Sequence, residues 1–589
     1  MIQESSPDIG TMVYVRNRDG QVTQKTDARG IITVYTYDYA GRITTRSYPS
    51  ETASDVAYTY DGVAGGNPGK GRLTSVTDAA GTVSNTYDLL GRVIQEVRTI
   101  GVKSYTVGYA WDDAGNLLSM TYPSGRVVEY GRGAAGEVQQ VRTSPDALSS
   151  PTELVLWGAY TPFGPRSITA FANDLRESRE YDTDGRIVGY GVEDQSLGQD
   201  LIRRALQYQD KRNLTSIEDQ LNAANNETYT YTANGFIENA DGPWGSLTYT
   251  IDGVGNITQR TITIGGVTST DTYSLQGGSN RLTGIVTGGT PSRGFQSDLA
   301  GNINEDATVT PAVTKAYSYN AAGQLAGATT NGSASGAYVY DYQSRLVSRT
   351  ISASSTTLHM VHDLDGNVIA EYNASGTLVT EYISVDGRPL AMVDNTGTTP
   401  ALYYVLTDHL ERPIMMTDES RNVVWQASYL PFGEVRSITG TATLNQRFPG
   451  QWYQLETGLS YNWHRHYDPT TGRYLQPDPL GMPDGPSRWA YVKNSPLMSV
   501  DPDGRTLVPW WSIFPPKRPE PAPNYCTVPD DDEEDECYKK YEEVDIPMCR
   551  GISRSRGPAA GERCYATAAA RLAACYAGKT IPPLDTWNN

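Results

Sequence analysis

The sequence predicts a mostly β protein in which short hairpins follow one another and form a spiral, cocoon-like sheet, with a small α-helical module at the C-terminus. A motif of Tyr, Asp, two variable residues, Gly and a polar residue recurs, as in YDYAGR at 37–42, YDLLGR at 87–92 and YDTDGR at 181–186. Half-copies lie about ten residues from these motifs, which leaves strands of roughly five to seven residues, a usual strand length. About a dozen such copies at near-regular intervals indicate a repeat architecture.

The composition favours a thin or hollow sheet over a continuous apolar core. Hydrophobic residues are only 38% of the 589 residues, and 40 tyrosines stand against 7 phenylalanines. Tyr and Thr suit strands that have one wet face, because both carry a polar group on a body that packs well in a sheet.

Each copy of the motif has the chemistry of a β-hairpin tip. Asp38 can accept a hydrogen bond from the backbone N–H two residues on. Gly41 can take the left-handed conformation that closes a short hairpin with a bulge. The stretch RRALQYQDKRNL at 203–214 could form a short helix, but it also resembles another hairpin, which we favour. Weaker copies of the motif are WDDAGNL at 111–117, IDGVGNI at 251–257, SDLAGNI at 297–303, YNAAGQL at 319–325 and HDLDGNV at 362–368.

Charge and hydropathy exclude several protein classes. No apolar run approaches the roughly 18–20 residues of a membrane span. The start, MIQESSPDIGTMVYVR, lacks a basic region followed by an apolar stretch, so we expect no signal peptide. A formal net charge of -19 argues against general nucleic-acid binding by the repeat body.

The composition and motifs of the sequence change at three points along the chain, which predicts four regions. Hairpin repeats occupy 1–401. A block rich in aromatics and in Asp-Pro and Pro-Phe-Gly turns occupies 402–505 and is typical of a compact cap. A Pro-rich extended linker covers 506–529, and a Cys-rich tail covers 530–589.

The ordered motifs of the 402–505 block carry a resemblance to a known family. TDHLERP, YLPFGEV, RFPGQWY, ETGLSYNWHRHYDPTTGRYLQPDPLG and AYVKNSP, followed by DPDG, occur there in that order. With the YDxxGR copies, they make the first 505 residues resemble the rearrangement-hotspot (Rhs) and YD-repeat family of bacterial polymorphic toxins. The resemblance implies a spiral β-sheet shell that encloses a variable C-terminal effector. It also implies that the 402–505 block plugs the shell. In many members of the family this block cuts its own chain just after the final DPxG motif.

Two aspartates are the candidate catalytic residues. Asp478 begins DPLG and Asp501 begins DPDG. An aspartyl protease needs two carboxylates that share a proton, so that one activates water and the other protonates the leaving group. The Asp-Pro pattern alone indicates that both residues simply begin turns. The resemblance instead implies that they correspond to the family's paired catalytic aspartates. Arg473 lies nearby in the sequence and is a candidate to orient one carboxylate.

The resemblance also gives a candidate cleavage position, between Arg505 and Thr506. In self-cleaving relatives leucine usually follows the final motif, whereas Arg505 stands at that place here. If leucine positions the scissile bond, cleavage of this chain is expected to be slow.

The histidines raise a metal hypothesis that the pattern does not favour. His464 and His466 alternate in NWHRHYD, so a strand would place both on one face, and His409 is a third candidate ligand. The helical HExxH spacing and a neighbouring carboxylate set are missing. We therefore expect neither a metal site nor a cofactor.

The sequence of the tail predicts two helices that disulfide bonds hold together. An acidic run, DDDEEDE, precedes CYKKYEEVD, and a second Ala-rich helix is ERCYATAAARLAACYAGK. Folding the helices against each other would pair Cys537 with Cys575 and Cys549 with Cys564, one of three possible connectivities, and would leave Cys526 over. Free thiols in a reducing compartment are the alternative. The tail is compatible with a small toxin, a membrane-active helical hairpin or an inert cargo.

Two classes of function follow. In the first, the chain is an exported or cell-surface effector whose shell encloses its own tail and acts in competition between bacteria. A secretion-machinery adaptor and a cognate immunity protein would then be its partners. In the second, the repeats form a surface or secreted scaffold that binds carbohydrate or protein, and the tail is structural.

Overall fold

The computed structural model describes residues 2–162, 164–209, 213–509, 567 and 571. The chain divides into two compact units, one of residues 1–37 and 43–519 and the other of residues 38–42 and 520–589. The predicted helical module and the candidate disulfide residues Cys537, Cys549, Cys564 and Cys575 lie outside the described residues, as does Cys526.

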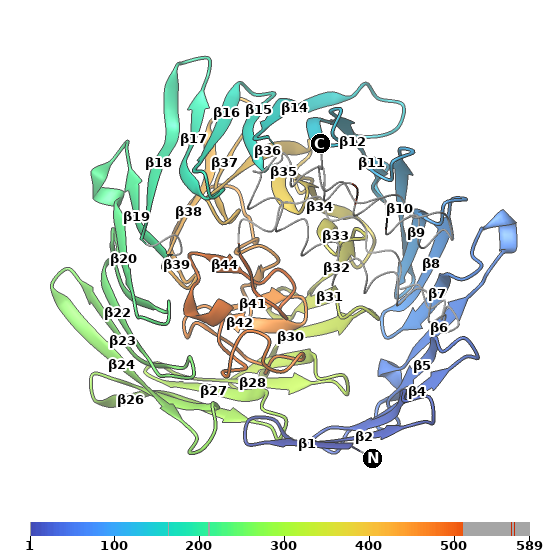
Figure 1. The fold of residues 1–589 in the computed structure, drawn as a ribbon, viewed down its shortest axis with the longest axis horizontal. Helices are drawn as coiled ribbons and strands as arrows, with labels where there is room; N and C mark the ends of the chain where they lie inside the picture. The colour runs from blue at the N-terminus through green and yellow to red at the C-terminus, as the bar shows by residue number, and fades with distance from the viewer. Residues whose placement is uncertain (1, 163, 210–212, 510–566, 568–570, 572–589) are drawn as a thin grey trace, which may run out of the picture. The chain divides into compact units, whose positions relative to one another are not determined.

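One antiparallel sheet of 39 strands runs through the described residues up to 440, and each strand pairs with the next one in the sequence (Figure 1). The predicted mostly β class is therefore confirmed, and the described residues of 203–214 lie on two paired antiparallel strands rather than in a helix. The strands up to residue 231 are β1 Ile2–Ser6, β2 Gly10–Arg16, β3 Val22–Thr26, β4 Ile32–Tyr37, β5 Ile43–Ser47, β6 Val56–Tyr60, β7 Leu73–Asp78, β8 Gly81–Tyr87, β9 Val93–Ile100, β10 Lys103–Trp111, β11 Leu117–Thr121, β12 Val127–Arg132, β13 Val138–Ser144, β14 Thr152–Tyr160, β15 Arg166–Phe171, β16 Leu175–Tyr181, β17 Ile187–Asp194, β18 Gln199–Gln209, β19 Asn213–Asp219 and β20 Glu227–Tyr231.

The remaining strands of this sheet are β21 Ile237–Gly242, β22 Gly245–Ile251, β23 Ile257–Ile264, β24 Val267–Leu275, β25 Leu282–Thr287, β26 Thr290–Ser297, β27 Ile303–Val309, β28 Ala312–Tyr319, β29 Leu325–Thr330, β30 Ser333–Tyr340, β31 Leu346–Ile351, β32 Thr356–His362, β33 Val368–Asn373, β34 Leu378–Val385, β35 Arg388–Asp394, β36 Ala401–Thr407, β37 Pro413–Thr417, β38 Val423–Tyr429 and β39 Val435–Gly440. Short 3₁₀ turns lie at Thr52–Ser54, Ala64–Gly66, Ala223–Asn225, Ser352–Ser354 and Val492–Asn494.

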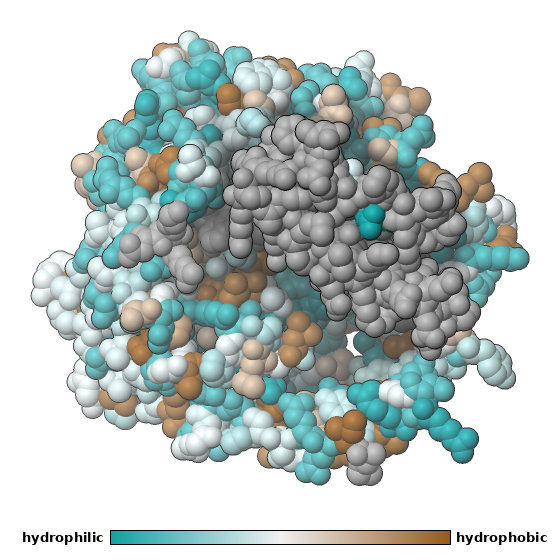
Figure 2. Space-filling model, viewed as in Figure 1, coloured by the Kyte–Doolittle hydropathy of each residue, from teal (hydrophilic) through white to brown (hydrophobic). Residues whose placement is uncertain are grey.

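Buried and exposed side chains alternate along the strands, as a sheet with one wet face requires. In β10, Tyr105, Val107 and Tyr109 are buried, while Ser104, Thr106 and Ala110 on the other face are exposed. The face shown in Figure 2 is largely polar, with apolar residues scattered over it. Within the described part of the chain, no helix has the length and apolar character that spanning a membrane requires.

The motif forms the hairpin tips that the sequence predicts. At the tip between β8 and β9, the Gly91 N–H donates to the Asp88 carbonyl at 3.0 Å, and Gly91 has a φ of 84°. Oδ1 of Asp88 accepts the Arg92 backbone N–H at 2.9 Å, and Oδ2 lies 2.6 Å from Nε of Arg92. A register shift between Thr86 and Tyr87 marks the expected bulge.

Where the motif begins with tyrosine, this residue ties its hairpin to the one before it. Its hydroxyl donates to the carbonyl of the first or second residue of the strand after the preceding tip, which explains why the chain uses Tyr and not Phe there. Examples are Tyr181 to Arg166, Tyr208 to Ile187, Tyr231 to Leu214, Tyr319 to Ile303, Tyr340 to Leu325 and Tyr429 to Pro413.

The sheet returns onto itself, so that strands far apart in the sequence meet along a seam. Nη1 of Arg29 donates to the Asn320 carbonyl at 3.0 Å, across 291 residues. Nε of Arg126 lies 2.6 Å from Oε2 of Glu381. Further along, Nη1 of Arg179 lies 2.7 Å from Oε1 of Glu411. These contacts stack one turn of the sheet on the next, which is the arrangement of a spiral.

Two small sheets follow the last repeat and lie within the curve of the long sheet in Figure 1. One contains β40 Trp452–Gln454, β41 Leu459–Asn462, β42 Arg465–Asp468 and β43 Arg473–Tyr474, and the other contains β44 Ser499–Val500 and β45 Val508–Pro509. The Tyr461 hydroxyl accepts the Leu346 N–H at 2.7 Å, and the Tyr467 hydroxyl donates to the Phe432 carbonyl at 2.7 Å. Hydrogen bonds therefore join the first of these sheets to the long sheet.

The tyrosine bond predicts a measurable loss of stability when only the hydroxyl is removed. Tyr340→Phe should lower the free energy of unfolding by about 1 kcal/mol, the usual net value of one buried hydrogen bond. Tyr317→Phe is a matched control, because the buried Tyr317 hydroxyl has no hydrogen-bond partner among the described residues. Urea unfolding of both variants measures the difference. An equal loss in the two variants would contradict this role of the motif tyrosine.

Candidate active site

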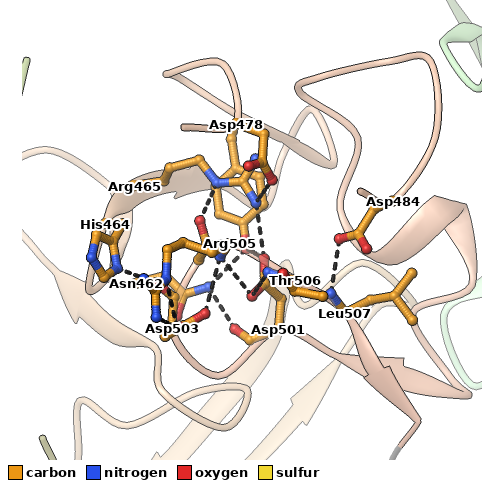
Figure 3. A network of polar contacts seen from close by, with 12 residues as sticks. Asn462, His464, Arg465, Asp478, Asp484, Asp501, Asp503, Arg505, Thr506 and Leu507 are labelled. Carbon is orange, nitrogen blue, oxygen red and sulfur yellow. Dashed lines mark hydrogen bonds and ion pairs between the residues drawn. The ribbon is translucent and has the colours of Figure 1, made fainter. Parts of the chain in front are cut away.

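The structure brings Asp478 and Asp501 together around one arginine. Asp478 follows β43, and Asp501 directly follows β44; both are buried. Nη2 of Arg465, the first residue of β42, lies 2.9 Å from Oδ2 of Asp478 and 3.0 Å from Oδ2 of Asp501 (Figure 3). The two carboxylates thus share one guanidinium nitrogen, although 23 residues separate them in the sequence.

The position of Arg465 is fixed from several sides. Its guanidinium carbon lies 3.6 Å from the centre of the Tyr474 ring. Nε donates to the Gly504 carbonyl at 2.5 Å, and Nη1 donates to the Arg488 carbonyl at 3.2 Å. A buried cation needs such partners, because an unpaired one costs several kcal/mol or more.

Asp501 holds the backbone at the predicted cleavage position. Its Oδ1 accepts the backbone N–H of Arg505 at 3.0 Å and that of Thr506 at 3.1 Å. Its Oδ2 accepts the Tyr474 hydroxyl at 2.7 Å, and Nδ2 of Asn462 donates to its backbone carbonyl at 2.8 Å. The Asp501 carboxylate therefore touches the nitrogen of the Arg505–Thr506 peptide bond.

A third carboxylate borders the same segment. Oδ2 of Asp484 accepts the Leu507 N–H at 2.8 Å, and burial raises the pKa of Asp484. Burial also raises the pKa of Asp478 to about 6. The Arg465 charge and the Leu480 amide oppose this rise, and the charges of Asp501 and Asp484 add to it. Asp478 thus exchanges its proton much nearer to neutral pH than an exposed aspartate does.

Arg473 points away from the two carboxylates. Its Nη1 donates to Oδ1 of Asn256 at 3.1 Å and its Nη2 to the Asn280 carbonyl at 2.6 Å. Burial lowers the pKa of Arg473 to about 10. Arg465 occupies the place between the aspartates instead. The sequence analysis missed Arg465, although it lies between the two histidines of NWHRHYD. It also missed Tyr474, which directly follows Arg473 in the same motif, and Asp484, which no motif marked.

The three histidines lie in separate surroundings. Nδ1 of His464 is 2.9 Å from the Asp503 carbonyl, and Nε2 of His409 is 3.1 Å from the Leu497 carbonyl. The His466 ring packs beside Tyr338 and Tyr461. Among the residues that the structure describes, no group of three His, Cys, Asp or Glu side chains is placed to hold a metal ion.

Family models match most of the repeat region. The model described as Teneurin YD-shell matches residues 165–484, more than half of the chain, and the RHS Repeat model matches 16–53, 69–100 and 111–148. The chain belongs to the Rhs/YD-repeat shell family. The resemblance found in the motifs is thereby confirmed.

Relatives of this Rhs/YD-repeat chain include two proteins named as toxins. It is 39% identical over 98 residues to Toxin protein Tse5 of Pseudomonas aeruginosa, covering 17% of this chain and 7% of that protein. It is 37% identical over 108 residues to Double-stranded DNA deaminase toxin A of Burkholderia cenocepacia, covering 18% of this chain and 8% of that protein. The matched segments thus span under a tenth of each toxin.

A solved structure shares the fold. The crystal structure of TcdB2-TccC3 without its hypervariable C-terminal region matches with a TM-score of 0.74 at 18% identity, over 85% of this chain and 28% of that one. The likeness covers the long sheet of this Rhs/YD-repeat protein and supports its description as a β-shell.

Proposed function

We propose that this Rhs/YD-repeat chain is part of an effector whose shell encloses a C-terminal segment, residues 506–589, and delivers it in competition between bacteria. Family membership, the toxin names of two relatives and the fold shared with TcdB2-TccC3 support this function. Export from the producing cell, a secretion adaptor and a cognate immunity protein belong to the same proposal. A surface or secreted binding scaffold with a structural tail is the alternative.

We further propose that the chain cuts itself between Arg505 and Thr506. The contact that carries this proposal is Oδ1 of Asp501 at 3.1 Å from the Thr506 nitrogen, the atom that would leave as an amine. A side chain that lies within hydrogen-bond reach of a reacting atom meets the geometric requirement for an acid or base in catalysis. Asp478 shares Arg465 with Asp501 and supplies the second carboxylate.

The two aspartates divide the proton transfers of hydrolysis between them. Asp501 accepts a proton from a water molecule, whose oxygen bonds to the carbonyl carbon of Arg505. The bond from that carbon to the Thr506 nitrogen breaks, and Asp478, whose raised pKa of about 6 lets it hold a proton, gives the departing amine that proton. The proton taken by Asp501 balances the one given by Asp478, so the pair ends with the number it began with. Arg465 offsets the negative charge that the two carboxylates bring together.

Each aspartate should be essential for cutting but not for folding. Purified wild-type protein should yield a C-terminal fragment that begins at Thr506, detected on denaturing gels and by mass spectrometry. Asp478→Asn and Asp501→Asn should each abolish the fragment, because an amide can neither activate water nor cycle the proton. Both variants should keep the wild-type circular dichroism spectrum, since Asn can still make the turn bonds. An uncut chain in the wild type and in Arg505→Leu alike would leave both aspartates as turn formers.

The raised pKa of Asp478 sets the pH dependence of the cut. Below pH 6 the Asp478 carboxyl keeps the proton that the departing amine needs, whereas above pH 6 it loses that proton. The first-order rate of fragment formation should therefore fall as the pH rises, with a midpoint near pH 6. A rate that stays constant between pH 5 and pH 7.5 would exclude Asp478 as the proton donor.

Growth assays separate the effector from the scaffold. Inducible expression of residues 506–589 should arrest bacterial growth in the cytoplasm or in the periplasm, while a chain that ends at Arg505 should have no effect. Equal growth with both chains in both compartments would favour the scaffold.

A further inference from the structure

The cleavage segment shares its sequence pattern, one carboxylate bond and a left-handed glycine with the hairpin tips. DPDGR at 501–505 has the same pattern as the repeat tip DTDGR at 182–186. Oδ1 of Asp182 accepts the Arg186 N–H at 2.9 Å, and Oδ1 of Asp501 accepts the Arg505 N–H at 3.0 Å. The glycines have φ values of 80° at Gly185 and 72° at Gly504. The two segments therefore provide a comparison within one chain.

The arginine side chain takes a different partner in the two segments. At the repeat tip, Nη2 of Arg186 lies 2.5 Å from Oδ2 of Asp182 and 3.5 Å from Oδ2 of Asp184. Nε of the tip arginine also contacts the first aspartate in the pairs Arg92–Asp88, Arg345–Asp341 and Arg412–Asp408.

At the cleavage segment the arginine binds the third residue of the motif instead. Nη2 of Arg505 lies 2.6 Å, and Nε 2.8 Å, from Oδ2 of Asp503 (Figure 3). Oδ2 of Asp501 is occupied by Arg465 and Tyr474.

Asp503 is itself held in place by β41 and the residues that follow it. Its carbonyl accepts the His464 N–H at 3.2 Å and lies 2.9 Å from Nδ1 of His464. The His464 ring stacks on Trp463 with an interplanar angle of 8°. The Asp503–Arg505 pair is partly exposed, at 27% and 42% of the two side chains, so its contribution to stability is small.

We propose that Asp503 is a positioning residue that keeps the Arg505 guanidinium off Asp501. This inference rests on the proposed self-cleavage. A second cation on the Asp501 carboxylate would compete with Arg465 and would displace the carboxylate from its place beside the Thr506 nitrogen. Because Arg505 binds Asp503, its guanidinium does not bind the first aspartate of the motif, as the arginines of the repeat tips do.

A double-mutant cycle on the full chain tests this role. Asp503→Asn keeps the side-chain size but removes the charge that holds Arg505, so fragment formation should slow by about tenfold, because a displaced catalytic carboxylate raises the barrier to cleavage. In the Arg505→Leu background, which has no guanidinium to misplace, the same change should alter the rate less than about twofold. Asp184→Asn is the matched control in the repeat tip and should leave cutting unchanged.

Two readouts keep this proposal separate from the self-cleavage on which it rests. Equal slowing by Asp503→Asn with and without Arg505, or no slowing in either background, would overturn the positioning role. A crystal structure of Asp503→Asn in the uncut Asp478→Asn background should show the Arg505 side chain on Asp501, and an arginine that stays away would overturn it as well. Absence of cutting in all four proteins of the cycle would refute self-cleavage, and the crystal structure would still decide the role of Asp503.

Discussion

The hairpin tips depend on one bond, from a backbone N–H back to an aspartate carboxylate four residues earlier. It appears with nearly the same length at Asp88, Asp182, Asp341 and Asp408. A tip that satisfies its own amides can be placed in water or buried, because burial leaves few polar groups unpaired. The tip at Asp408 is indeed buried, whereas the tips at Asp341 and Asp88 are partly exposed. The same local motif can therefore form tips that face water and tips that are buried where strands far apart in the sequence meet.

Two further sets of bonds convert these hairpins into a shell. The motif tyrosines join each hairpin to its predecessor, so they act along the sheet. Ion pairs such as Arg126–Glu381 and Arg179–Glu411 act across the seam. A buried ion pair adds little net stability, but a partner that is lost or displaced leaves an uncompensated charge that costs several kcal/mol. The seam pairs therefore oppose any slip of one turn against the next.

The cleavage segment shares part of the hairpin-tip motif, but its side chains make different contacts. Its backbone bond to Asp501 is that of the repeats, and its glycine and arginine stand at the same places in the motif. Arg465 on β42 and Tyr474 on β43 take the carboxylate oxygen that the tip arginine binds elsewhere. Because Asp478 reaches the same guanidinium, a turn-forming aspartate becomes one of a pair. Burial then moves the pKa of Asp478 to about 6.

The sequence alone determined the repeat, the hairpin tips and the β class, because each depends on residues within about ten positions of one another. It also placed Asp478 and Asp501 among the candidates, through the ordered motifs of the 402–505 block. Only the tertiary structure decided that Arg465 and not Arg473 lies between them, since that choice depends on how β42 and β43 pack. It also decided that Asp484 borders the segment and that Arg505 pairs with Asp503. Contacts of this kind join residues that lie far apart in the sequence. The local sequence pattern is the same whether the aspartate of the motif binds the arginine of its own motif or, as Asp501 does, an arginine from another strand.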